Sequence, residues 1–242
     1  MGYGKNDKKF MILFLNFAPI EFMGGAEKWM MDISSFFNKT EPTTLVSVAQ
    51  KVSNIYGQLV LQRRFNTRAH VDKKSYSEKI DLGWNHFLPF SQNWKKARTS
   101  FQKARIIYIK FEIMELIILL YFGGFGIFKK TIAGLHSPFL YYKPSRFLDS
   151  LHNFFYSSII TKYFLSKMRT IHVMNNRDQK FLQNTFLLEH VVTIPNGVKI
   201  ENKKLKQLSN DKKLHVLFTG ELSERKGVDI LLDVIKNAPD YF

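Results

Sequence analysis

Residues 10–37, FMILFLNFAPIEFMGGAEKWMMDISSFF, decide the fold class of this chain. The segment begins with a continuous apolar run over residues 10–17, which is typical of a strand buried on both faces of a parallel sheet. The glycine pair Gly24 and Gly25 follows. Apolar residues then recur at the spacing of one helical face: Ala26, Met30, Ile33 and Phe37. This order of strand, glycine turn and helix predicts a βα unit.

Apolar runs of strand length and helical patterns continue to alternate, which indicates a parallel sheet wrapped by helices. We predict further strands at residues 43–49, 82–88, 105–110, 131–135, 170–174 and 191–194. We predict further helices at residues 94–104, 112–121, 146–166 and 177–184, the last with a capping box from Asn176 to Gln179. The fold class is therefore α/β, with one complete doubly wound, Rossmann-like domain over residues 1–198.

The composition changes after this domain. Residues 199–213 are almost wholly polar and charged, as expected of a linker. Residues 214–242 then give a strand, a polar loop and an amphipathic helix, the first β–α unit of a second domain. Since one such unit does not build a sheet of its own, we expect the chain to be a fragment, or this piece to pack on another chain.

Composition narrows the classes of partner. The 242 residues include 36 Lys and Arg against 20 Asp and Glu, so the net charge of +16 favours a nucleic acid, an anionic lipid surface or a phosphorylated substrate. The absence of cysteine excludes disulfide frameworks, cysteine-ligated metals and thiol nucleophiles. The longest apolar stretch, residues 113–128, is too short and too interrupted to predict a membrane-spanning helix.

Residues 51–110 concentrate the positive charge, with thirteen basic and three acidic residues. Aromatic residues are interleaved with these cations: Trp84, Phe87, Phe90, Trp94 and Phe101. This mixture suits contact with the headgroups of an anionic membrane surface. A merely solvated basic face, with some of the aromatic residues in the core, is the alternative.

Three short motifs are candidate binding or catalytic features, and each also has a purely structural explanation. Gly24 and Gly25 would let the backbone approach an anion at a helix N-terminus, or would form an ordinary tight turn. His136 follows a predicted strand, at the sheet edge where α/β proteins bind ligands, or is structural. Arg225 and Lys226 precede the last helix as a diphosphate site or as a solvated charge run.

Taken in order, these motifs resemble the retaining glycosyltransferases of the GT-B fold, family 4 (glycosyl transferases group 1). The resemblance rests on four stretches: residues 14–27 ending in Gly-Gly-Ala-Glu, residues 134–137 (GLHS), residues 192–198 (VTIPNGV) and residues 216–232 (VLFTGELSERKGVDILL). It implies two doubly wound domains with the active site between them. The chain would then end early in the second, donor-binding domain, before the family's Glu-x7-Glu motif.

The resemblance also implies roles for the site residues. Gly24 and Gly25 would lie under the donor phosphates, catalytic His136 would approach the transferred sugar, and Arg225 and Lys226 would bind the departing diphosphate. Fixed cations and a helix dipole can stabilise that diphosphate without a metal. No Asp-x-Asp metal clamp is present, so we predict neither a metal nor a cofactor. Glu221 stands where the family usually has an arginine.

The expected activity is the transfer of a sugar, with retention, from a nucleoside-diphosphate sugar to a glycan or lipid-linked acceptor. We expect a role in cell-surface polysaccharide or glycolipid synthesis, in the cytoplasm and peripherally on the inner face of the cell membrane. Two alternatives remain open: an inactive folded fragment of such an enzyme, and a basic nucleic-acid-binding protein. The second has the charge but no recognition motif, so nucleic acid is not among the predicted partners.

Overall fold

The computed structural model of the chain describes residues 10–17, 25–47, 76–82, 92–136, 139–140, 147–197 and 227–237. The chain divides into two compact units, residues 1–197 and residues 198–242. The strands are β1 (Ile12–Asn16), β2 (Thr43–Ser47), β3 (Glu78–Asp81), β4 (Ile106–Lys110), β5 (Thr131–Leu135), β6 (Thr170–Val173) and β7 (Val191–Thr193). The helices of the first unit are α1 (Gly25–Phe37), α3 (Gln92–Lys103), α4 (Ile113–Gly123), the 3-10 helix η3 (Phe125–Lys130), α5 (Phe147–Tyr156), α6 (Ile159–Lys167) and α7 (Asn176–Thr185).

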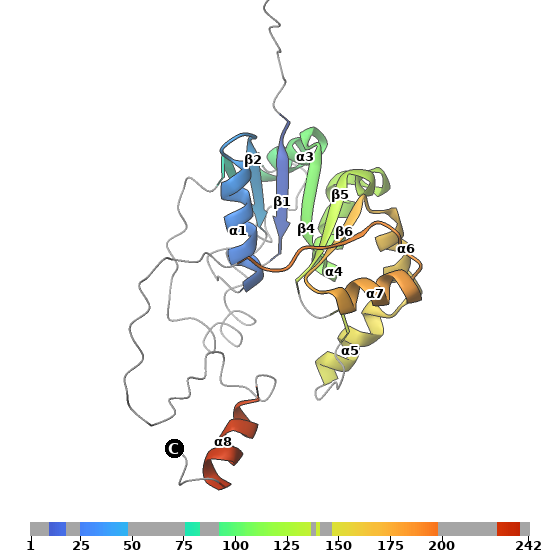
Figure 1. Ribbon diagram of the computed structural model, residues 1–242. Helices are drawn as coiled ribbons and strands as arrows, with labels where there is room; N and C mark the ends of the chain where they lie inside the picture. The colour runs from blue at the N-terminus through green and yellow to red at the C-terminus, as the bar shows by residue number, and fades with distance from the viewer. Residues whose placement is uncertain are drawn as a thin grey trace, which may run out of the picture. The chain divides into compact units, whose positions relative to one another are not determined.

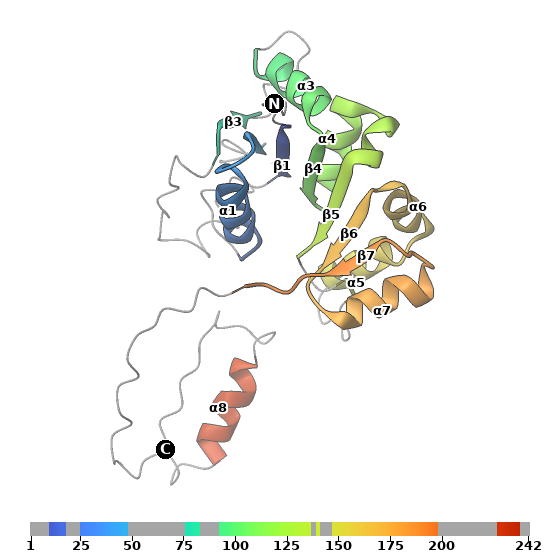
Figure 2. The ribbon, with the colours of Figure 1, turned by 45° about the horizontal axis from the view of Figure 1, so that its top comes forward.

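The strands form one seven-stranded sheet in the order β3-β2-β1-β4-β5-β6-β7, and every pair is parallel (Figures 1 and 2). From β1 the chain proceeds outward through β2 to β3, and from β4 it proceeds outward in the opposite direction. The sheet is therefore doubly wound and Rossmann-like, with its switch point between β1 and β4. This confirms the predicted α/β class and the parallel sheet.

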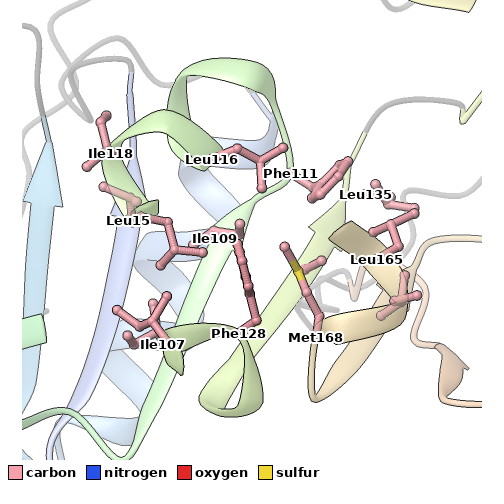
Figure 3. Packing of buried hydrophobic residues seen from close by; sticks show 14 of the residues in the cluster. Leu15, Ile107, Ile109, Phe111, Leu116, Ile118, Phe128, Leu135, Leu165 and Met168 are labelled. Carbon is pink, nitrogen blue, oxygen red and sulfur yellow. The ribbon is translucent and has the colours of Figure 1, made fainter. Parts of the chain in front are cut away.

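Alternate residues of the central strands pack on opposite faces of the sheet. On one face, Ile12 and Phe14 lie in a cluster with Met30 of α1. On the other face, Leu15 belongs to a larger core with residues of α3, α4 and later elements. Figure 3 shows part of that core: Leu15, Ile107, Ile109, Phe111, Leu116, Ile118, Phe128, Leu135, Leu165 and Met168. The run of apolar residues in β1 thus reflects burial on both faces.

The predicted long helix over residues 146–166 is wrong, because the chain forms α5 and α6 instead. Ser158 adopts an extended conformation and its hydroxyl accepts a hydrogen bond from the Thr161 amide at 3.2 Å, which begins α6. Apolar residues at helical spacing in this range are consequently not all buried: Leu151 is 51% exposed and Ile159 is 82% exposed. The cap at Ser158 therefore begins a new helix, although the apolar spacing continues through this point.

Two further predictions differ from the structure locally. The cap of α7 is Asn175, one residue before the predicted Asn176, and its side chain accepts from the Asp178 amide at 2.9 Å. The strand predicted to begin at residue 82 is not found there, because β3 occupies Glu78–Asp81 and ends just before the predicted range. Leu82 lies after it in the core, and residues 83–88 lie outside the described residues.

In the second unit the structure describes residues 227–237, which contain α8 (Val228–Asn237). None of the residues of α8 is buried, and its apolar side chains include the exposed Ile230, Leu232 and Ile235. The predicted strand at residues 214–219 lies outside the described part of the chain. Among the described helices, none has both the length and the apolar character needed to cross a bilayer.

Candidate functional site

The carboxyl ends of β1 and β4 meet at the switch point, the edge at which doubly wound sheets bind ligands. Here the Phe17 amide, directly after β1, donates to Glu115 Oε1 of α4 at 2.8 Å. Glu115 is buried, and none of the described residues forms a hydrogen bond with its second oxygen, Oε2. Burial, followed by repulsion from Glu112, raises the pKa of Glu115 from its ordinary 4.5 to about 8. This carboxyl is therefore mostly protonated at neutral pH.

Lys110 ends β4 at the same edge and is paired with two acids. Its Nζ lies 2.8 Å from Glu112 Oε1 and 3.7 Å from Glu27 Oε1 in the first turn of α1. Burial by itself lowers the pKa of Lys110, but the attraction of Glu112 and Glu27 outweighs it and leaves the pKa raised. Lys110 is therefore a fixed cation that is already neutralised by its neighbours.

His136 directly follows β5 and belongs to a chain of hydrogen bonds that includes side chains of β4 and β6. Its Nε2 lies 2.9 Å from the hydroxyl of Tyr108 in β4. The same hydroxyl lies 2.7 Å from Nδ1 of His172 in β6. The Nε2 of His172 lies 2.8 Å from the carbonyl oxygen of Ile194, after β7. One chain of hydrogen bonds thus runs from His136 to the backbone beside the last strand.

The register of the sheet makes this chain of hydrogen bonds possible. Lys110 pairs with Gly134, and Gly134 pairs with His172, so Tyr108 must extend its ring across β5 to reach His172. A Cβ atom at Gly134 would overlap the Tyr108 hydroxyl. The glycine in residues 134–137 is therefore required here for close packing of a side chain above the strand.

Trp29 of α1 covers the three rings of this cluster. Its ring centroid lies 5.1 Å from that of Tyr108, 4.7 Å from that of His136 and 5.1 Å from that of His172. Burial, followed by the influence of His172 and Lys110, lowers the pKa of His136 to about 3. Burial also lowers the pKa of His172, partly offset by the Ile194 carbonyl. Both imidazoles are therefore neutral at physiological pH.

A small cleft borders His136. Its lining consists of Lys110, Phe111, Glu112, Leu135, His136, His152 and Tyr156. The titratable groups that face His136 are thus Tyr108, Lys110 and Glu112 from β4 and the start of α4, His152 from α5, and His172 from β6. A neutral imidazole in such a cleft can exchange hydrogen bonds with a hydroxyl group but carries no charge with which to bind an anion.

The predicted site residues are only partly described. His136 lies at the carboxyl edge of the sheet, and Gly25 is the first residue of α1, the helix that carries Trp29. Gly24, Arg225, Lys226 and Glu221 lie outside the described residues. Within the described ranges, no group of three or more His, Asp or Glu side chains could hold a metal ion.

Sequence reasoning did not select four residues of this edge: Trp29, Tyr108, Glu115 and His172. Tyr108, Glu115 and His172 carry polar groups within otherwise apolar buried elements, and that exception to the pattern was the available signal. No protein-family model matches this chain, and no curated protein matches its sequence.

Proposed function

We propose that this protein is a retaining glycosyltransferase of the GT-B type, which transfers a sugar from a nucleoside-diphosphate sugar to a glycan or lipid-linked acceptor. The observation that carries the proposal is His136: a neutral imidazole at the carboxyl edge, held by Tyr108 and bordering a cleft. A sugar offers hydroxyl groups, and a neutral imidazole is a suitable partner for them. The sequence resemblance independently selects the same histidine for contact with the transferred sugar.

The charges at the carboxyl edge of the sheet suggest that the sugar and the diphosphate are bound by different residues. Lys110 is already paired with Glu27 and Glu112, so this edge favours an uncharged part of the substrate over a diphosphate. In the proposal the donor phosphates lie over Gly24 and Gly25, and the departing diphosphate is bound by Arg225, Lys226 and the helix N-terminus that follows them. Sugar transfer at such a site requires no metal, since fixed cations stabilise the departing charge.

The described surface also supports a membrane-facing role, in a form different from the one predicted. Phe101 is fully buried, so it is wrong as a headgroup contact, and Trp94 is half-buried and packs against the core. Trp84, Phe87 and Phe90 lie outside the described residues. We propose instead a basic apolar surface on α3 and α4, which pack together. It consists of the exposed Lys95, Lys96, Arg98, Lys103, Ile113, Ile117 and Tyr121.

This surface combines exposed apolar side chains with positive charge, the two properties that favour binding to an anionic membrane. Ile113, Ile117 and Tyr121 recur every fourth residue on one face of α4, and the cations of α3 lie on the neighbouring helix. Each basic residue close to an anionic bilayer contributes about 1 kcal/mol of attraction. A lipid-linked acceptor on the inner face of the cell membrane would be reached from such an attachment, with the enzyme in the cytoplasm.

The proposed activity is tested on the purified full-length protein. Radiolabelled UDP-glucose, UDP-galactose, UDP-N-acetylglucosamine and GDP-mannose are incubated with a cell lipid extract, with and without EDTA. We expect release of nucleoside diphosphate and label in the lipid fraction, unaffected by EDTA. NMR of the product should show the anomeric configuration of the donor. An inverted product, or activity that EDTA abolishes, would contradict the mechanism.

A further inference from the structure

The hydrogen bonds around Tyr108 determine where the protons lie, because the last acceptor in the chain is a carbonyl. The Ile194 oxygen can only accept, so His172 Nε2 must carry a proton and donate it. Since His172 is neutral, its Nδ1 is then unprotonated and accepts from the Tyr108 hydroxyl at 2.7 Å. The Tyr108 oxygen, having donated its one proton, accepts from His136 Nε2 at 2.9 Å.

We propose that Tyr108 and His172 are positioning residues that fix His136 in its Nε2–H tautomer, so that Nδ1 presents a hydrogen-bond acceptor to a sugar hydroxyl. No described residue bonds to that Nδ1. The proposal rests on the proposed function for the identity of the ligand, but the assignment of the protons does not depend on it. An acceptor at this position selects a group that donates, such as a hydroxyl, and disfavours a carboxylate or phosphate.

Packing holds this arrangement in place. Trp29 covers Tyr108, His136 and His172, and the Tyr108 hydroxyl occupies the space above Gly134 where any side chain would intrude. Tyr108 is buried, and burial raises its pKa well above 10, so its hydroxyl keeps its proton over the working pH range. Its single proton is therefore committed to His172, and its oxygen remains available to His136.

The tautomers are measurable without any substrate. The 242-residue chain is labelled with ¹⁵N-histidine, and long-range ¹H–¹⁵N NMR spectra distinguish protonated from unprotonated ring nitrogens. His136→Gln and His172→Gln variants assign the two signals. We expect His136 to show a protonated Nε2 and an unprotonated Nδ1 from pH 8 down to pH 5, and His172 to show the same pattern at pH 8. A proton on His136 Nδ1, or titration of His136 within this range, would overturn the proposal.

Two variants then test the role of the relay. In Tyr108→Phe, His136 loses its fixed partner, so we expect it to become a mixture of tautomers, while His172 stays bound to Ile194. In His172→Phe, the Tyr108 hydroxyl is released to donate to His136 Nε2, and we expect the His136 proton to move toward Nδ1. A single unchanged His136 tautomer in both variants would refute the positioning role. If one of the two variants does not fold, an unchanged His136 tautomer in the other variant still refutes the positioning role.

Tyr163→Phe is the matched control, since it removes the hydroxyl of an exposed tyrosine of α6 that does not line the cleft beside His136. It should leave the His136 spectrum unchanged. In the transfer assay we expect Tyr108→Phe to lower kcat with little change in the KM for donor, and Tyr163→Phe to change neither. If the histidines show the expected tautomers but the protein transfers no sugar, the proposed function is rejected and the tautomer assignment stands.

Discussion

Replacing Glu115 by glutamine removes a proton equilibrium from the buried edge between β1 and β4. Glutamine has the shape of a protonated glutamate, and its Oε1 can still accept the bond from the Phe17 amide. The substitution therefore preserves the packing and removes only the ability to ionise. Its effect on the free energy of unfolding should depend strongly on pH.

The sign follows from the raised pKa. Between pH 4.5 and about pH 8 the unfolded chain releases the Glu115 proton while the folded chain retains it. The folded state thus binds more protons, so the stability of the wild-type protein falls as the pH rises through this window. Each pH unit corresponds to about 1.4 kcal/mol, so the loss between pH 5 and pH 8 is roughly 4 kcal/mol.

The assay is urea unfolding at pH 5, 6.5 and 8, followed by tryptophan fluorescence. At pH 5 we expect Glu115→Gln and the wild-type protein to have similar stability. At pH 8 the variant should be more stable by up to roughly 4 kcal/mol, with an unchanged dependence on urea. Glu189→Gln, which makes the same change at an exposed carboxyl, is the control and should show no such trend. A stability difference that does not change with pH would refute the reasoning.

Three other predictions concern capping and the surface. Lys130→Met should lower the free energy of unfolding of the first unit by about 2 kcal/mol in urea, because Nζ donates to the carbonyls of Phe101, Gln102 and Ala104 at the end of α3. Lys129→Met is the control, and an equal loss in both variants would contradict this prediction. Ser158→Ala should cost about 1 kcal/mol through the lost cap of α6, and an unchanged midpoint would show that the cap contributes nothing. Charge reversal of Lys95, Lys96 and Arg98 should abolish co-sedimentation with anionic liposomes at low salt, and equal binding to neutral vesicles would exclude the proposed surface.

The sequence predicts the fold class well because burial on both faces of a parallel sheet leaves a continuous apolar signal. β1, β4 and β5 each lie within runs that could be recognised from residue type alone. The break between α5 and α6 could not be recognised in the same way, because apolar residues keep their helical spacing across Ser158. Competition between a local cap and helix propagation is decided by packing, which a residue pattern does not contain.

The candidate site was predictable only in part. His136 stands out because it follows an apolar strand, at the edge where parallel strands end. Its partners Tyr108 and His172 are brought to it by the pairing of β4, β5 and β6, and the register of that pairing cannot be read from spacing along the chain. Glu115 is visible in the sequence as one acid within an apolar helix, but the pattern does not show that this acid faces the core and the end of β1.

Turnover of His136→Ala tests the central claim most directly. In the full-length protein, at saturating donor, we expect the variant to lose about 10²–10³ in rate while it remains folded. His190→Ala is the matched control, because His190 directly precedes β7 at the opposite edge of the sheet. It should transfer sugar at the wild-type rate. Wild-type turnover in His136→Ala would contradict the assignment of this edge as the site of sugar transfer.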